Sequence, residues 1–281
     1  MNSNSIQIYN GEGASNICVK AWKRELKDIA DDRLYIVEDF NQSYTAGFDR
    51  GNVALVIIPG GDSIKMLKPC ETLADKINTA VADQSSFLGS CAGAYVSSAF
   101  MTVNSIRKLL PSDTNFNINP VPYISKYYMP NSTSTSDPEN KTAVDVEWLP
   151  SSGHFESKNC RLYHAFGPAF PLEQFPVHVK GNCRSLVRYI TEGNVHKSQN
   201  APAAILYSPP GNRSCPRLFT GVHPEIGIED IRSHAFAQAF DKPDHPHIEK
   251  LVNRLEDSEL MRKEICRSWF SELGLSVKKN Y

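Results

Sequence analysis

The stretch Phe87-Leu88-Gly89-Ser90-Cys91-Ala92-Gly93-Ala94-Tyr95 decides the fold of this 281-residue chain. An apolar strand runs into the pattern Gly-x-Cys-x-Gly, and small residues that suit a helix follow. This pattern is the cysteine form of a nucleophile elbow, a sharp strand-to-helix turn in which the two glycines leave room for a strained central residue. The turn is expected to lift the Cys91 thiol above the carboxyl edge of a sheet, where open α/β sheets bind their ligands.

Strand patterns alternate with helix patterns along the first hundred residues. The continuous apolar run Val53–Ile58 is typical of a strand buried on both faces of a parallel sheet. The alternation predicts a doubly wound, mostly parallel α/β sheet. We predict strands at Ser5–Tyr9, Leu34–Val37, Val53–Ile58 and Ser86–Gly89, and helices at Ser15–Ala30 (with Ser15 as its cap), Glu71–Asp83 and Ala92–Phe100.

The second half of the chain is expected to extend the same sheet with partly antiparallel strands. Residues from about 105 to 143 are rich in Pro, Ser, Thr and Asn and predict a loop-rich insertion, either a surface excursion or a lid. A C-terminal helical segment from about 247 to 273 ends at Gly274. We predict one domain over residues 1–281, with later strands at Val144–Leu149, Arg161–Phe166, Val177–Val179, Leu186–Tyr189, Ala203–Tyr207 and Arg217–Thr220.

A nucleophilic thiol needs a base, and His223 has the most suggestive setting of the eight histidines. It follows a predicted strand, and Glu225 stands two residues later. In an extended segment, residues two apart point the same way, so Glu225 can hold one ring nitrogen while the other faces the thiol. Cys91, His223 and Glu225 are therefore the candidate catalytic residues.

The start of the helix after Cys91 predicts an oxyanion hole. Its positive dipole end favours a thiolate, and the N–H of Ala92 can donate to an oxyanion. A second donor is expected from Gly60 or Gly61, just past the preceding strand. Asp62, Tyr95 and His164 are candidate walls of a substrate pocket, and His164 is the second choice as base.

Composition excludes several classes of function. The net charge is −1 and both signs are mixed along the chain, which argues against a nucleic-acid footprint or a membrane surface. The N-terminus lacks the pattern of a secretory signal, and no apolar run is long enough to span a bilayer. The seven scattered cysteines show no CxxC spacing, which predicts reduced thiols in a cytoplasmic protein, with no metal site.

Five segments give the chain a family resemblance that covers most of its length. It resembles class I glutamine amidotransferase-like proteins, and among them the N-terminal domain associated with some biotin–protein ligases. The resemblance implies a flavodoxin-like sheet and a Cys91–His223–Glu225 triad that needs no cofactor. The segments are Tyr9-Asn10-Gly11, Val56-Ile57-Ile58-Pro59-Gly60-Gly61-Asp62, Phe87–Tyr95, Tyr163-His164-Ala165-Phe166-Gly167-Pro168-Ala169-Phe170 and Gly221-Val222-His223-Pro224-Glu225.

Two departures from the family pattern shape the functional hypothesis. Members that use glutamine typically carry Gln four residues after the nucleophile, where this chain has Tyr95, which argues against glutamine as substrate. The Gly-Arg-Gly-Arg signature of a biotin ligase is missing, so we do not predict biotinylation. The leading hypothesis is a stand-alone enzyme for amide or acyl hydrolysis or transfer.

Two alternatives stay open at this stage. The same residues also fit a non-catalytic binding or regulatory module that kept the elbow, and a cysteine peptidase or hydrolase of the same superfold. The expected partner is a small-molecule or peptide amide substrate. A separate partner protein and a homo-oligomer are both compatible with the sequence.

Overall fold

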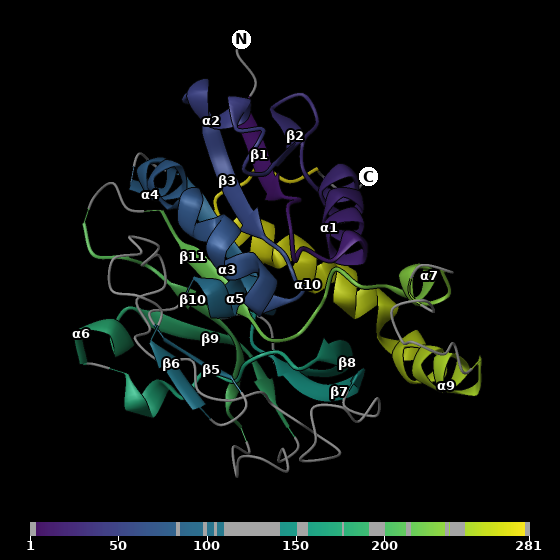
Figure 1. The fold of residues 1–281 in the computed structure, drawn as a ribbon. Coiled ribbons are helices and arrows are strands. Elements are labelled where there is room, and N and C mark those ends of the chain that lie inside the picture. Colours follow the sequence, from purple (N-terminus) through teal and green to yellow (C-terminus); the bar gives the residue numbers. More distant parts are fainter. Residues whose placement is uncertain are drawn as a thin grey trace.

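A nine-stranded sheet forms the centre of the computed structural model, in the order β2-β1-β3-β4-β11-β10-β9-β7-β8 (Figure 1). The described residues are 4–82, 85–97, 100–103, 106–109, 141–150, 157–175, 177–190, 200–211, 215–233, 236 and 245–278. The strands of this sheet are β1 (Asn4–Tyr9), β2 (Tyr35–Phe40), β3 (Val53–Ile58), β4 (Ser86–Ser90), β7 (Lys141–Trp148), β8 (Lys158–Ala165), β9 (Cys183–Tyr189), β10 (Pro202–Tyr207) and β11 (Arg217–Thr220).

The sheet has a parallel half and an antiparallel half. Neighbours from β2 to β11 pair in parallel, and neighbours from β11 to β8 pair antiparallel. The α/β class and the antiparallel extension are thus confirmed, but the sheet is mixed rather than mostly parallel. Strands β5 (Phe100–Val103) and β6 (Ile106–Leu109) form a separate antiparallel pair.

Helices cover both faces of the parallel half (Figure 1). On one face, α1 (Asn16–Ile29) and α10 (Glu259–Glu272) pack their tryptophans, Trp22 and Trp269, into a core with Leu88. On the other face, α3 (Ser63–Thr72), α4 (Ala74–Ala82) and α5 (Ala92–Val96) pack around Phe87. Phe87 and Leu88 enter opposite cores because successive side chains of a strand point to opposite faces.

The remaining helices are short or lie toward the C-terminus. The segment predicted as helical at about 247–273 contains α9 (His245–Leu255) and α10, joined by the 3₁₀ helix η3 (Glu256–Ser258), and Gly274 follows with a positive φ of 80°. The short helices elsewhere are α2 (Ala46–Asp49), α6 (Val177–Lys180), α7 (Ile228–Ile231) and the 3₁₀ helix η2 (Leu172–Gln174).

Three local predictions were wrong. The strand predicted at Val177–Val179 is helix α6: Val177 is 88% exposed while Val179 is buried, whereas strand residues two apart would share a face. The helix predicted at Ala92–Phe100 ends at Val96, and Phe100 begins β5. Ser15 occupies the cap position of α1, but its side chain makes no capping hydrogen bond.

The helix predicted at Glu71–Asp83 is two helices, and the first starts earlier than expected. Helix α3 begins at Ser63, where the Asp62 carboxylate accepts from the N–H groups of Ile64 and Lys65. It contains Pro69, which usually interrupts a helix, and this residue hides the pattern in the sequence. Of the predicted insertion, residues 106–109 and 141–143 lie in strands, and the predicted lid lies outside the described residues.

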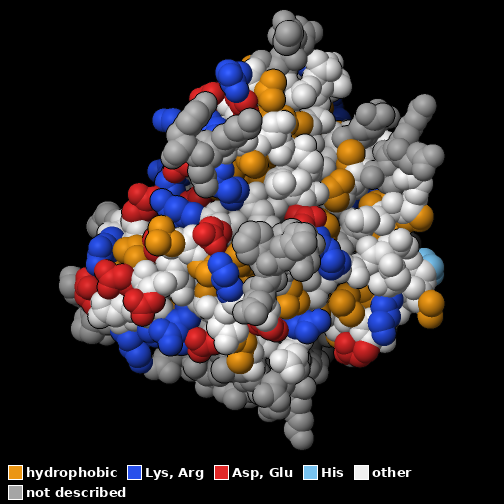
Figure 2. Space-filling model, turned by 180° about the vertical axis from the view of Figure 1, so that it is seen from behind, with side chains coloured by type: hydrophobic (Ala, Val, Ile, Leu, Met, Phe, Trp, Pro, Cys, Tyr) orange, Lys and Arg blue, Asp and Glu red, His pale blue; other side chains and the backbone are white. Residues whose placement is uncertain are grey.

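Basic and acidic side chains are interspersed on the rear face of the molecule (Figure 2). Among the described residues, ion pairs join Arg184 with Glu272 and Arg161 with Asp145. None of the helices among the described residues has the length and apolar character needed to cross a membrane.

Helix α5 touches the end of β3 so closely that position 93 has no room for a side chain. A Cβ on Gly93 would lie 1.9 Å from the carbonyl oxygen of Ile58. We therefore expect Gly93→Ala to lower the free energy of unfolding by about 1–3 kcal/mol, because the helix must move off the sheet. Urea denaturation followed by circular dichroism measures this loss.

Gly181→Ala is the matched control for this experiment. A Cβ there would meet its nearest heavy atom, the Val177 carbonyl oxygen, at an ordinary 3.5 Å. Its stability should stay within about 0.5 kcal/mol of the parent. Equal effects of the two substitutions would contradict the close approach of α5 to β3.

Candidate active site

The register of three parallel strands brings the candidate residues to one edge of the sheet. Ser90 at the end of β4 pairs with Thr220 at the end of β11, and Gly89 pairs with Ile58 at the end of β3. Cys91 follows Ser90 directly, and its N–H donates to the Thr220 carbonyl at 2.7 Å. The loops that carry Gly60 and His223 leave the sheet beside the cysteine for the same reason.

Cys91 has the strained backbone expected of an elbow. Its φ is 49° and its ψ is −105°, a region that L-residues rarely adopt and that costs about 1–3 kcal/mol. Ala92 starts α5, where an N–H has no acceptor within the helix. The Cys91 thiol donates to the Ala165 carbonyl at 3.4 Å. A Cβ placed on Gly60 would lie 2.7 Å from the Cε1 of His223 and 3.6 Å from the Cβ of Cys91, so the ring and the cysteine flank this glycine.

His223 and Glu225 form a buried pair. The Nδ1 of His223 donates to the Glu225 Oε1 at 2.8 Å, and both side chains are almost fully buried. Ser90 donates from its hydroxyl to the same oxygen at 3.3 Å. The other carboxylate oxygen, Oε2, is buried and has no hydrogen-bond partner among the described residues.

The surroundings of His223 favour its protonated form. Burial alone would lower the pKa of the imidazole, but the Glu225 carboxylate and the thiols of Cys18 and Cys91 raise this pKa well above 6.5. A nearby negative charge stabilises an imidazolium, and a buried site screens that charge weakly. The imidazole is therefore set up to hold a proton beside the thiol.

Two arginines hold the backbone that carries the pair. Arg24 of α1 donates to the carbonyl of Glu225 at 2.8 Å, and Arg262 of α10 donates to the carbonyl of Pro224 at 2.6 Å. Arg262 also pairs with the buried carboxylate of Glu25 at 2.9 Å. Because these charges are paired and hydrogen-bonded, helices on one face of the sheet can fix the loop of the triad.

Cys18 is the residue of the cluster that sequence reasoning missed. Its Sγ lies 3.9 Å from the Nδ1 of His223, and burial raises the pKa of its thiol. A Cβ on Gly60 would lie 2.7 Å from the Cε1 of His223 and 2.9 Å from this sulfur, so only glycine leaves room there. The two cysteines are 73 positions apart in the sequence, and no local signal links them.

An open pocket of about 220 Å³ lies in front of the cluster. Apolar and aromatic side chains dominate its walls, and Lys141 adds a cation. The polar or reactive side chains in its lining are Ser15, Cys18, Cys91, Lys141, Tyr163 and His223, and Gly61 lines it as well. Burial raises the pKa of the Tyr163 hydroxyl, so this side chain stays neutral near neutral pH.

The three predicted pocket residues lie elsewhere. Asp62 is exposed and caps α3, as described above. Tyr95 is buried beneath the site and donates from its hydroxyl to the Phe166 carbonyl at 3.1 Å. His164 is fully buried, with its Nε2 3.4 Å from the Gly167 carbonyl and its ring against Tyr189.

The alternation of β8 explains why Tyr163 and Ala165 line the pocket and His164 does not. Neighbouring residues of a strand face opposite sides, so a strand can present either set to the site. Tyr163 accepts a backbone hydrogen bond from the N–H of His223 at 2.8 Å, and this contact docks β8 onto the triad loop. The prediction of His164 as a pocket wall therefore named the right strand and the wrong face, because the face that β8 presents depends on this contact.

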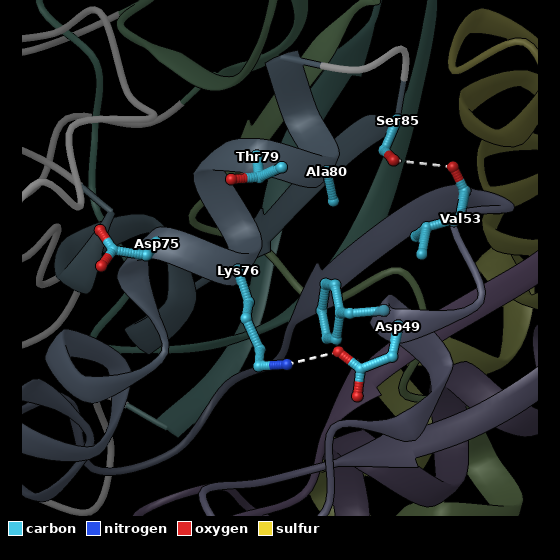
Figure 3. Close-up of a pocket in the computed structure, with 9 residues that line it drawn as sticks. Asp49, Val53, Asp75, Lys76, Thr79, Ala80 and Ser85 are labelled. Atoms are coloured by element: carbon cyan, nitrogen blue, oxygen red, sulfur yellow. Dashed lines mark hydrogen bonds and ion pairs between the residues drawn. The ribbon is translucent and has the colours of Figure 1, made fainter.

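A second hollow, of about 260 Å³, lies away from the triad between α2, α4 and β3 (Figure 3). Lys76 reaches across it to Asp49 at 2.5 Å, and Ser85 donates to the Val53 carbonyl at 2.7 Å. These polar groups satisfy one another, and the lining contains neither cysteine nor histidine. The triad pocket is therefore the better candidate for chemistry.

Comparison with known proteins identifies the family. The sequence model described as "Biotin-protein ligase, N terminal" matches residues 4–281, which is nearly the whole chain. The chain belongs to this family. The resemblance seen in the five sequence segments is thereby confirmed. No curated protein sequence matches the chain significantly.

Solved structures of glutamine amidotransferases share the fold of this family member. One from Thermotoga maritima has a TM-score of 0.58 at 13% identity and covers 97% of this chain and 99% of its own. One from Methylobacillus flagellatus has a TM-score of 0.55 at 11% identity and covers 100% of this chain and 98% of its own. At these identities the likeness concerns the fold, which is amidotransferase-like over its full length.

The buried pair predicts a pH-dependent effect of Glu225→Gln. Because the folded-state pKa of His223 is raised, the pair's stabilisation is complete below the unfolded pKa of about 6.5 and is lost as pH rises through the folded pKa. Glu225→Gln should therefore lower the free energy of unfolding by about 1.5–3 kcal/mol near pH 6 and by less near pH 9. Urea denaturation in the presence of a chelator measures both values.

Glu229→Gln is the control for this prediction. Like Glu225, Glu229 forms an ion pair, here with Arg24, but the Glu229 side chain is 64% exposed. Exposed pairs contribute at most about 1 kcal/mol, and this one contains no histidine to titrate between these pH values. A loss at Glu225 that is the same at both pH values would contradict the charge-based account.

Proposed function

We propose that the chain is a cysteine-dependent enzyme of amide or acyl hydrolysis or transfer, with Cys91 as nucleophile. One observation carries the proposal: the thiol on a strained elbow lines the same pocket as an imidazole whose Nδ1 donates to a buried carboxylate at 2.8 Å. This arrangement is the nucleophile, base and orienting group of a triad. Because Glu225 is buried and accepts the hydrogen bond from Nδ1, it keeps the ring of His223 in one orientation.

The proposed reaction starts with attack of the Cys91 sulfur on a carbonyl carbon. The N–H groups of Ala92 and of Gly60 or Gly61 stabilise the oxyanion, each contributing about 3 kcal/mol to lowering the barrier. His223 donates its proton to the leaving amine, and the C–N bond breaks to give a thioester. Water, deprotonated by His223, then attacks the thioester. The C–S bond breaks, which releases the acid and returns the Cys91 thiolate. In a transfer reaction, a second amine attacks in place of water and takes the acyl group.

The residue at position 95 and the apolar walls of the pocket support a substrate other than free glutamine. Tyr95 replaces the glutamine residue typical of glutamine-using members, and its hydroxyl is occupied by the Phe166 carbonyl. Ile17, Tyr163, Phe166, Ile226 and Phe236 give the pocket an apolar surface. We infer a small-molecule or peptide amide with an apolar portion. This inference includes a peptidase as one form of the same chemistry.

A second candidate function is that of a binding or regulatory module. In the described state the Cys91 thiol is engaged by the Ala165 carbonyl, and Cys18 rather than Cys91 lies beside the Nδ1 of His223. These contacts are also compatible with a closed, non-catalytic site. On either account we infer a flavodoxin-like, doubly wound core, which is supported by the strand order β2-β1-β3-β4 and by helices on both faces.

Selective alkylation tests whether Cys91 is a working nucleophile. We expect iodoacetamide at about pH 7 to modify Cys91 first, because thiolates react and burial raises the pKa of five other thiols. The pKa rises to about 12 for Cys70, Cys160 and Cys183, and it also rises for Cys18 and Cys266. Peptide mass spectrometry over a time course reads the order.

Cys215 is the internal benchmark for that experiment, since it is more exposed than Cys91 and has no place in the triad. His223→Gln should slow alkylation of Cys91 at least about tenfold and leave Cys215 unchanged. If Cys91 reacts no faster than Cys215, the binding-module account is favoured over catalysis.

Turnover and trapping test the reaction itself. We expect activity on a panel of glutamine, small amides and peptides to fall at least about 10³-fold in Cys91→Ala, with unchanged thermal unfolding. Rapid acid quench and mass spectrometry should find the acyl group on Cys91 of the parent. A hydrolytic activity that survives Cys91→Ala at full rate would refute the proposal.

A further inference from the structure

Three different ligand types converge beside the elbow. Cys18 Sγ, a ring nitrogen of His223 and a carboxylate oxygen of Glu225 all lie within 4.8 Å of one another, and all three residues are buried. Thiolate, imidazole and carboxylate are the three side-chain ligands that zinc prefers. We propose that these three residues form a Zn²⁺ site that overlaps the triad.

The distances are close to those of a tetrahedral zinc site. Zn–S and Zn–N bonds of about 2.3 and 2.0–2.1 Å place sulfur and nitrogen about 3.6 Å apart, and nitrogen and oxygen about 3.3 Å apart. The observed separations are 3.9 Å from Cys18 Sγ to His223 Nδ1, and 2.8 Å from this nitrogen to Glu225 Oε1. For these two pairs, shifts of about half an ångström accommodate the ion, which replaces the proton between Nδ1 and Oε1, and the sulfur and the carboxylate oxygen lie within 4.8 Å of each other.

Charge and hydrogen bonding also favour a cation at this place. Glu225 is fully buried, and its Oε2 has no hydrogen-bond partner among the described residues. A buried carboxylate with an oxygen that lacks a partner is costly, and a cation bound at Oε1 lowers the cost of burying the negative charge. With the Cys18 thiolate, one carboxylate and one neutral imidazole, the charge of a divalent ion is fully balanced.

The fold holds Cys18 beside His223 through the loops before α1 and α3. The N–H of Ser15 donates to the Gly60 carbonyl at 2.9 Å, and the N–H of Asp62 donates to the Gly13 carbonyl at 2.8 Å. These bonds join the start of α1, which carries Cys18, to the loop beside His223. Because the site opens onto the pocket lined by Cys91, the fourth position can be taken by a solvent molecule.

Occupation of this site would silence the triad. Zinc on the Nδ1 of His223 separates the ring from Glu225 and prevents it from carrying a positive charge. This consequence rests on the proposed function, whereas the binding itself does not. The cysteine spacing gives no sign of the site, since its ligands come from α1 and from the loop after β11.

Cobalt spectroscopy tests the site directly. We expect the reduced full-length chain to bind one Co²⁺ with a thiolate-to-cobalt charge-transfer band and tetrahedral visible bands, and to exchange it for one Zn²⁺, which binds more tightly. Cys18→Ser should abolish the band and weaken Zn²⁺ binding, measured by calorimetry, at least about tenfold. Glu225→Gln should also weaken zinc binding.

Two further variants make the outcome decisive. Cys70→Ser removes another buried thiol, far in sequence from all three ligands, and should leave the band intact. Cys91→Ala should abolish turnover but retain the band. The site is refuted if the parent shows no thiolate band, or if Cys18→Ser, folded as judged by its thermal unfolding, retains it. A band lost in Cys91→Ala but kept in Cys18→Ser would assign the metal to Cys91 and also refute the proposal.

The two proposals can fail separately. A parent that is inactive when free of metal, and that shows the cobalt band after Co²⁺ is added, would contradict the proposed enzyme and leave the metal site standing. An active parent without the band would do the reverse. If both hold, stoichiometric Zn²⁺ should inhibit turnover and a chelator should restore it, with the same concentration dependence as binding.

Discussion

The parallel pairing of β4 with β11 is the constraint on which the site depends. It places Ser90 opposite Thr220, and the bond from the Cys91 N–H to the Thr220 carbonyl extends that register by one residue. Since β11 lies next to β4 although 126 residues separate Ser90 from the start of β11, the thiol meets an imidazole that is remote in sequence. The strained φ of Cys91 is tolerable because packing on both faces of the sheet fixes the strand and helix that flank it.

The sequence identified the parts of this site that local geometry dictates. The glycines around Cys91 predict the elbow, and the spacing of His223 and Glu225 predicts their contact, because each involves neighbours along the chain. The α/β class followed from the same local patterns. In contrast, Cys18, Tyr163 and Ala165 enter the site through contacts between elements far apart in sequence, which periodicity alone does not encode.

The errors in secondary structure have a common physical origin. Val177–Val179 has the β-branched composition of a strand, yet no strand of the described residues pairs with it, and it forms a single helical turn with one valine exposed. Propensity is weak compared with tertiary context for such short segments. Pro69 likewise concealed helix α3, because the cost of a proline depends on where the helix begins and how it packs.

The two arginines that contact the triad loop position its backbone more than they stabilise the fold. Arg262 and Glu25 are almost fully buried, and a buried ion pair often stabilises a protein no more than apolar residues of the same volume. Here, however, Arg262 also binds the Pro224 carbonyl, and Arg24 binds the Glu225 carbonyl. Apolar replacements could fill the space but could not hold these two carbonyls. The pair is therefore best understood as a brace for the loop between His223 and Glu225, through which two helices on one face of the sheet determine where the imidazole points.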